Sequence, residues 1–281
     1  MITNFISNKW SSAVELAAME SSIARMVTGD RYQVDATGTS VIKTARVSDI
    51  DIIDYTNDTD LSALQSLSDI GVTINLNLKK AFNLSIDDVD AVQSAGNFRD
   101  AAIIQAGMTL GLEADKYAFG LYAGADSGNK VGTLGTPISI TSSNVDEHVY
   151  TLKEILDAQN AGPTRWLVVP SWFMTKLNLA GLGVQLSDRI KDSIYLDGNI
   201  IRFAGFNIVQ SNSLTVDSTA DATQIMAFTD RALPMVFQVN KVEALRNTKR
   251  FSDIVRGLFV AGATVAFPKE LATLSAIKGA N

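Results

Sequence analysis

Hydrophobic and polar side chains alternate most strictly from Val72 to Lys79. Valine, isoleucine and leucine occupy every second position there, with threonine, asparagine and lysine between them, which is the period of a strand with one apolar face. Val41 to Ile53 also favours a strand, because β-branched residues recur between charged ones. Asp54 to Gly71, which lies between these stretches, is polar. The pattern therefore predicts a long two-stranded β-ribbon from Thr39 to Ile86.

An isolated two-stranded ribbon is only marginally stable in water, and ordering each residue costs about 1–2 kcal/mol of backbone entropy. The predicted apolar face therefore needs a cover. Either the same chain folds back over this face or a neighbouring subunit covers it, and the pattern fits both. The side chains that form the face are Val72, Ile74, Leu76 and Leu78.

Three further segments have the features of helices. Apolar residues recur at helical spacing from Trp10 to Met26, and this segment either packs on the core of its own chain or docks as an arm on a neighbour. Ser85, followed by two aspartates, is expected to begin a short helix. The segment from Phe98 to about Ala123 is apolar on more than one face and would be about 40 Å long. We expect it to be a structural spine that is covered on several sides.

The rest of the chain mixes short strands with helices. Asn144 is expected to cap a helix over 145–159, and Pro268 to end the last strand. The order helix, strand, helix between 145 and 179 indicates an α/β layer. The predicted strands are 137–141, 166–169, 200–203, 206–210 and 225–228, with a β-rich stretch over 235–267, and the second helix of the layer is predicted over 170–179.

Composition narrows the class of protein. With 281 residues and 46% hydrophobic content, the chain can bury a sizeable core in one large or two modest domains. A net charge of -6 and a pI near 4.9 argue against a basic nucleic-acid groove. The absence of cysteine excludes disulfides and thiolate chemistry. No apolar run is long enough to cross a bilayer, and the first ten residues lack a signal-peptide pattern. The expected compartment is the cytoplasm, or a particle assembled there.

The sequence offers few residues for catalysis. His148 is the only histidine and lies inside a predicted helix, so a zinc site would lack ligands and a Ser-His-Asp triad would depend on it alone. The glycine-rich stretch from Gly124 to Lys130 has the wrong spacing for a phosphate-binding loop. The aspartates between Asp49 and Asp60 lack the pattern of a calcium loop, and we interpret them as a solvated face. We therefore predict no catalytic, cofactor-binding or metal-binding residue, and no enzymatic activity.

Four stretches stand in a specific order over nearly the whole chain. They are NLKKAFNLSIDDVDAVQS, SSNVDEHVYTLKEILDAQNAGPTRWLVVPSWFMTKL, GNIIRFAGFNIVQSNSL and RFSDIVRGLFVAGATVAFPKELATL. The first resembles the passage from an extended loop into a spine helix, and the second resembles a helix, a strand ending in Val-Val-Pro and another helix. The third resembles a Gly-x-Ile hairpin followed by Gly-Phe, and the fourth a closing sheet and tail. Together they resemble the major capsid (coat) proteins of tailed phages, which have the Hong Kong 97-type fold.

This resemblance implies an α+β fold with a long spine helix, an extended β-hairpin called the E-loop, a peripheral domain and an α/β axial domain. The implied boundaries are an N-terminal arm at 1–29, the E-loop at 30–84, the peripheral domain with the spine helix at 85–137, the axial domain at 138–233, and the peripheral return with the C-terminal tail at 234–281. Some relatives carry a cleaved N-terminal scaffolding segment. This chain has no room for one before the arm, so a separate scaffolding protein, or none, is expected.

The resemblance also implies a structural function. Subunits would self-assemble into hexamers and pentamers of an icosahedral shell that encloses phage double-stranded DNA. The expected partners are further copies of the chain, separate scaffolding, portal and decoration proteins, and DNA held without sequence-specific binding, with no membrane and no cofactor. The location would be the virion capsid, after assembly in the host cytoplasm. The alternatives are an encapsulin-like compartment with enzyme cargo, which shares the fold, and an α/β enzyme whose ribbon folds back on itself.

In such a shell we expect the ribbon to lie across an adjacent subunit. The neighbour would cover the apolar face of the ribbon, Lys43 and Arg46 would pair with acidic residues there, and Arg250 and Asp253 would lie in peripheral contacts. The predicted subunit-interface residues are Trp10, Lys43, Arg46, Val72, Ile74, Leu76, Leu78, Arg250 and Asp253.

Overall fold

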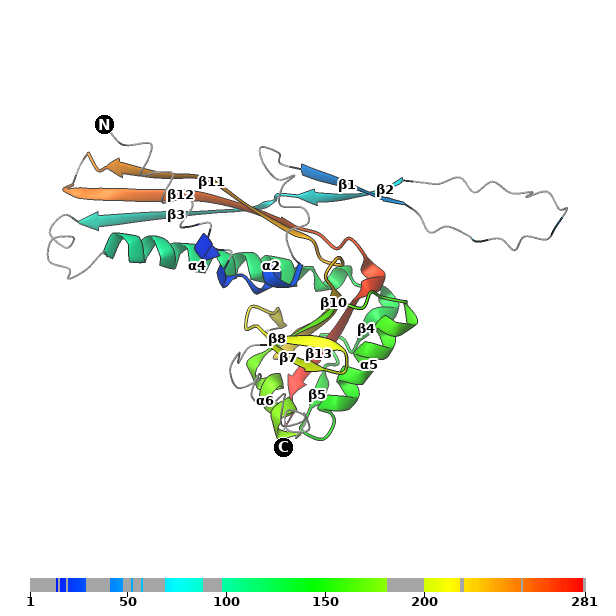
Figure 1. Ribbon diagram of the computed structural model, residues 1–281. Coiled ribbons are helices and arrows are strands. Elements are labelled where there is room, and N and C mark those ends of the chain that lie inside the picture. Colours follow the sequence, from blue (N-terminus) through cyan, green and yellow to red (C-terminus); the bar gives the residue numbers. More distant parts are fainter. Residues whose placement is uncertain are drawn as a thin grey trace, which may run out of the picture.

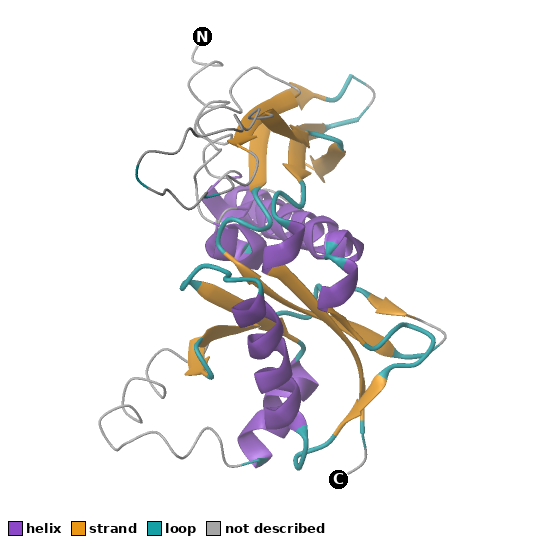
Figure 2. Cartoon of the chain, turned by 90° about the vertical axis from the view of Figure 1, so that its right-hand side faces the viewer, coloured by secondary structure: helices purple, strands orange, loops and turns teal. Residues whose placement is uncertain are grey.

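The structure is a computed structural model of the chain. It describes residues 14, 16–18, 20–28, 41–47, 52, 57, 69–87, 98–180, 200–217, 220–248 and 250–279. The described strands form a two-stranded ribbon, a three-stranded sheet and an eight-stranded sheet. The three-stranded sheet lies along the long helix α4 (Phe98–Phe119), and the eight-stranded sheet lies near one end of that helix (Figure 1). In the view turned by 90°, helices lie between the smaller and the larger group of strands (Figure 2).

The three-stranded sheet contains β3 (Leu78–Asp87), β11 (Met235–Arg246) and β12 (Ser252–Ala263), all antiparallel, with β12 in the centre. Val255, Phe259 and Ala261 alternate along β12 and are buried in the core cluster that α4 shares. The opposite face of β12 carries exposed side chains such as Leu258. One face of this sheet is therefore covered by α4, and part of the other is open.

The two-stranded ribbon is formed by β1 (Val41–Val47) and β2 (Asp69–Asn75). After Leu76 and Asn77 the chain enters β3, whose whole length pairs with β12. The predicted ribbon from Thr39 to Ile86 is thus divided, and residues 78–87 belong to the three-stranded sheet. The prediction that a helix begins at Ser85 is wrong, because Ser85 lies inside β3. The rest of that expected helix lies outside the described residues.

The base of the ribbon crosses the three-stranded sheet closely at Gly262. A Cβ atom at this position would lie 2.6 Å from the carbonyl oxygen of Asn75 and 3.1 Å from the Cα of Leu76. Only glycine lets the two backbones approach in this way. The contact brings Ile42, Ile74 and Leu76 against Val236 and Val260 in a small separate core. The ribbon is therefore held at its base by its own chain.

The eight-stranded sheet has the strand order β4-β13-β10-β6-β8-β7, with β5 paired to β13 and β9 to β10. Helices α5 (Val145–Ala158) and α6 (Ser171–Leu179) pack on one face and share a hydrophobic core with it. Strand β10 is buried along its whole length. The strand bounds are β4 Lys130–Val131, β5 Ile138–Ile140, β6 Arg165–Val169, β7 Ile200–Phe203, β8 Phe206–Gln210, β9 Val216–Asp217, β10 Ala222–Thr229 and β13 Leu271–Lys278.

Three single-turn 3₁₀ helices complete the described elements, at Gly120–Gly124, Ser127–Asn129 and Pro268–Glu270. The last of these corrects the prediction that Pro268 ends the final strand. Pro268 begins a turn, and β13 follows it in the middle of the eight-stranded sheet, next to β10. Residues 271–278, which the expected boundaries placed in the peripheral return and tail, therefore pair with strands of the expected axial domain.

The helix–strand–helix layer has the predicted order, but the start of its first helix, α5, is not capped by the Asn144 side chain as predicted. Asn144 precedes α5 without a side-chain capping bond. Its Oδ1 accepts a hydrogen bond from the Thr141 backbone at 2.8 Å, and its Nδ2 donates to the Ser139 carbonyl at 3.0 Å. The amide therefore braces the loop before the helix. The predicted hairpin between β7 and β8 turns at Ala204 and Gly205, both with positive φ.

Candidate assembly surfaces

The N-terminal segment of the chain docks on α4 along a line of small residues. Helix α2 (Ile23–Thr28) and the described residues between Val14 and Ser21 are helical. Gly107 and Gly111 face this segment, because a Cβ at Gly107 would lie 2.8 Å from the Val14 carbonyl and one at Gly111 would lie 2.6 Å from the Ala18 carbonyl. The segment therefore packs on the core of its own chain, which was one of the two alternatives. Trp10 lies outside the described residues.

Asp115 extends the same line by one helical turn and holds the start of α2. One carboxylate oxygen, Oδ1, accepts hydrogen bonds from Ser22 Oγ at 2.5 Å and from the Ala24 backbone at 3.0 Å. The other, Oδ2, accepts one from the Ile23 backbone at 2.9 Å. Asp115 is fully buried. A carboxylate of α4 thus satisfies backbone N–H groups at the first turn of α2, which an isolated helix would leave unpaired.

Burial raises the pKa of the Asp115 carboxyl above its ordinary value, although its three hydrogen bonds act in the opposite direction. Two residues earlier, Glu113 has a different environment. The ammonium groups of Lys116 at 2.7 Å and Lys80 at 3.1 Å lower the pKa of the Glu113 carboxyl. Because Lys80 lies on β3, this ion pair joins the three-stranded sheet to α4.

A second line of apolar side chains on α4 is open in the described chain. Ile104 and Met108 are each 43% exposed and Leu112 is 46% exposed. They follow one another at i, i+4 and i+8, beside the line that carries the N-terminal segment. Ile103 and Leu110 lie on the opposite, buried side. The three-stranded sheet and the N-terminal segment cover the spine on several sides, as expected, but this line stays open among the described residues of one chain.

The structure separates the four predicted apolar residues of the ribbon. Ile74 and Leu76 are 0% and 4% exposed within the single chain, so the prediction that a neighbouring subunit covers them is wrong. Val236 and Val260, which lie far away in the sequence, supply their cover. Val72 is half-buried, and Leu78 is half-buried against the main core. The same chain therefore covers the base of the apolar face.

The two predicted basic residues of the ribbon lie on β1. Lys43 is exposed and pairs in register with Thr73. Arg46 pairs in register with Ile70, near the end of the strand that is distant from the small core. Both residues belong to β1, which lies beside one end of the three-stranded sheet (Figure 1). Their partners in a second subunit stay a prediction.

The remaining predicted residues lie at the far end of the hairpin between β11 and β12. Arg250 is exposed. Asp253 is half-buried and accepts a hydrogen bond from Arg246 Nη1 at 3.1 Å, across the antiparallel pair that joins these two residues. Phe251 lies between Arg250 and Asp253 in the sequence and is highly exposed. The sequence pattern did not single this residue out. This hairpin end, residues 246–253, is called the hairpin tip below.

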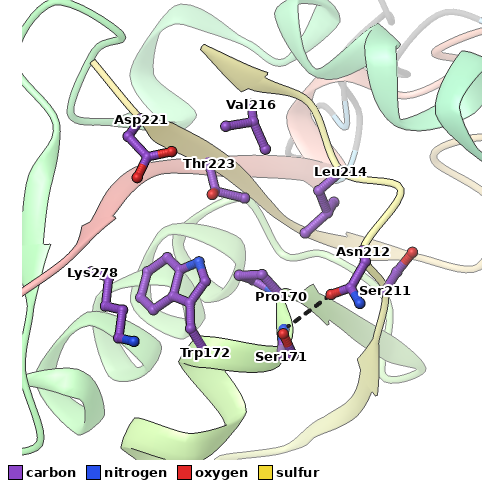
Figure 3. A pocket seen from close by; sticks show the side chains of 10 residues that line it. All are labelled: Pro170, Ser171, Trp172, Ser211, Asn212, Leu214, Val216, Asp221, Thr223 and Lys278. Carbon is purple, nitrogen blue, oxygen red and sulfur yellow. Dashed lines mark hydrogen bonds between the residues drawn. The ribbon is translucent and has the colours of Figure 1, made fainter. Parts of the chain in front are cut away.

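A shallow pocket of about 240 Å³ lies where the parallel strands β6 and β8 end and α6 begins (Figure 3). Trp172 and Lys278 line one side of it, and Asp221 and Thr223 lie across from them. Asn212 Oδ1 accepts a hydrogen bond from the first backbone N–H of α6 at 3.4 Å. No group of three metal-ligating side chains occurs in the described part of the chain. None of the described helices is long and apolar enough to cross a membrane.

Comparison with known proteins identifies the class to which this architecture belongs. A family model described as "Phage capsid protein" matches residues 71–274, which is well over half of the chain. A solved structure from Mycobacterium phage Che8 has 28% sequence identity, with 90% of each chain covered and a TM-score of 0.69. The capsid of cyanophage P-SCSP1u has 18% identity over 86% of this chain and 85% of that one, with a TM-score of 0.64. A search of the curated proteins gave no match.

The fold also occurs in a virus-like particle from Pyrococcus furiosus, with 11% identity, 96% of this chain and 99% of that one covered, and a TM-score of 0.58. These likenesses define the Hong Kong 97-type capsid fold. The chain belongs to the phage capsid protein family. It is a structural major capsid protein of a virion, and copies of it assemble into an icosahedral shell.

Proposed function

We propose that the subunits form hexamers and pentamers that enclose phage double-stranded DNA, and that β1 and β2 are the E-loop by which each subunit reaches its neighbour. Support comes from the uneven cover of the ribbon. Ile42 and Ile74 at its base are buried in the small core, whereas Val72, which lies on the same face of β2 further from the base, is only half-buried. A two-stranded ribbon without a further cover is marginal in water. A second copy would provide the cover beyond the base.

The domain assignment follows the expected boundaries with two changes. We assign 1–29 to the arm, 30–77 to the E-loop, 78–137 with 234–270 to the peripheral domain, and 138–233 to the axial domain, which β13 completes. The E-loop then ends near Asn77, because β3 is a strand of the three-stranded sheet. The spine helix α4 connects the two regions along its length of about 33 Å.

Many modest contacts would hold such a shell together. A contact worth about 4 kcal/mol gives only millimolar affinity between two free subunits. Closure multiplies these contacts and stabilises the shell, while single errors stay reversible. The partners of the shell would be scaffolding, portal and decoration proteins, where the particle uses them, and DNA held without sequence-specific contacts. Assembly would take place in the host cytoplasm.

Purified particles test this proposal. The expressed protein should form closed shells in negative-stain electron microscopy, and shells from infected cells should contain genomic DNA that resists added nuclease. Shells that carry protein cargo and no nuclease-resistant DNA would overturn the DNA-enclosing function in favour of a compartment. A stable monomer at micromolar concentration, under conditions that favour assembly, would overturn the self-assembly itself.

A further inference from the structure

The hairpin tip carries an exposed aromatic ring. Phe251 is 82% exposed, and it is the only exposed residue among the phenylalanines whose burial is described. Aromatic side chains gain much free energy when they leave water and dominate the energetics of interfaces. A ring held in solvent at the end of a sheet is therefore a candidate for a contact with another molecule.

The backbone around Phe251 is braced on both sides. The Ser252 backbone N–H donates to the Arg250 carbonyl at 2.9 Å, and the Asn247 backbone N–H donates to the Ser252 carbonyl at 3.0 Å. Asn247 Nδ2 also donates to Ser252 Oγ at 3.2 Å, and Ser252 is buried. Strand β3 supports the other side, because Asp87 pairs in register with Ser252. The ring is thus presented by ordered backbone, which lowers the entropy cost of binding.

Within the described part of the chain, nothing covers Arg250 or Phe251 at the tip. The tip is at the end of the three-stranded sheet that points away from the eight-stranded sheet (Figure 1). Residues 246–253 contain three basic side chains, Arg246, Lys249 and Arg250, against one acidic side chain, Asp253, which accepts a hydrogen bond from Arg246, so the tip keeps an excess of positive charge. The whole chain has a net charge of -6, so an average surface of another copy is complementary to this tip.

We propose that Phe251 is an anchor by which the hairpin tip of one subunit binds a second copy of this chain in the shell. The inference rests on the proposed function, since it names one contact by which assembly proceeds. The ring enters an apolar recess of the neighbour, and Arg250 pairs with an acidic group at the rim. Interface hot spots combine buried aromatic side chains with arginine in this way.

The test measures the critical concentration for assembly of the full-length protein, by light scattering and sedimentation, for wild type, Phe251→Ala and Phe251→Leu. Truncating an anchor weakens a pairwise contact by about 30-fold or more, so Phe251→Ala should raise the critical concentration about tenfold or more. Phe251→Leu keeps an apolar side chain and should recover most of the loss. Thr248→Ala, in the same loop and also exposed, is the matched control and should assemble as wild type does.

The melting temperature of unassembled Phe251→Ala should equal that of wild type, because an exposed ring contributes little to the fold. Wild-type failure to form shells would overturn the proposed function itself. Wild-type shells together with an unchanged critical concentration for Phe251→Ala would overturn only the anchor. Equal loss in Phe251→Ala and Thr248→Ala would also overturn it, because loop conformation and not the ring would then control assembly.

Discussion

Ser22 Oγ donates a hydrogen bond of 2.5 Å to Oδ1 of Asp115, across 93 residues of sequence and between two buried side chains. The same carboxylate accepts the backbone N–H groups of Ile23 and Ala24. The spine helix therefore provides the N-terminal cap of α2, and Asp115 acts together with the close packing at Gly107 and Gly111 to hold the N-terminal segment on α4.

Replacing Asp115 by asparagine should loosen the N-terminal segment. The amide keeps the shape of the carboxylate but turns an N–H₂ group towards hydrogen-bond donors, and a buried donor left unsatisfied costs about 1–3 kcal/mol. The free energy of unfolding of unassembled subunits should fall by that amount, and hydrogen exchange at Ile23 and Ala24 should accelerate. The control is Glu113→Gln, on the same helix, whose largely exposed ion pairs are worth about 0–1 kcal/mol. Equal effects of the two variants would contradict the capping role.

The difference in unfolding free energy between wild type and Asp115→Asn should change with pH in a definite direction. Burial raises the pKa of Asp115 above its ordinary value of 3.8, so the folded chain keeps the proton to a higher pH than the unfolded chain does. The stability that this group contributes is full below 3.8 and declines as the pH rises through the folded-state pKa. The difference in unfolding free energy between wild type and Asp115→Asn should therefore shrink over this window. A difference that grows with pH in urea titrations would contradict the burial effect.

Adding a methyl group at Gly111 should displace the N-terminal segment from α4. The new Cβ would overlap Ser21 Oγ and lie 2.6 Å from the Ala18 carbonyl, and a backbone carbonyl cannot move aside cheaply. Overpacking of this kind costs about 1–3 kcal/mol. Gly120→Ala is the matched control, because nothing lies within 4 Å of a Cβ there. Limited proteolysis should cleave Gly111→Ala faster than Gly120→Ala within residues 14–28. Equal rates would contradict the close packing.

Much of the fold is readable from local signals. The hairpin between β7 and β8 follows from two short apolar runs around Ala204-Gly205, and α6 follows from Pro170 at its start. The sequence does not predict strand β13, because this strand is buried on both faces and its sequence, LATLSAIK, lacks clear alternation. Pro268, which precedes β13, has the sequence signal of a strand end, although in the structure it begins a single 3₁₀ turn.

The candidate surfaces were less predictable, because they depend on contacts between distant residues. The apolar alternation around Ile74 showed that a cover is needed, but not that Val236 and Val260 provide it. Asp115 follows Gly107 and Gly111 at helical spacing, which is a readable signal for a docked partner, yet the identity of that partner is not encoded locally. Phe251 stands in a charged stretch without periodicity, so only its exposure in the folded chain reveals it.

The central claim is that the E-loop, which consists of the ribbon and the segment 48–68 that connects its two strands, joins one subunit to the next in the shell. Negative-stain electron microscopy of a variant that lacks residues 54–68, compared with wild type at equal concentration, tests it most directly. This deletion leaves β1, β2 and the small core intact, so the melting temperature of the unassembled subunit should be unchanged. The account predicts folded subunits that no longer form closed shells. Closed shells of wild-type size and yield would contradict it.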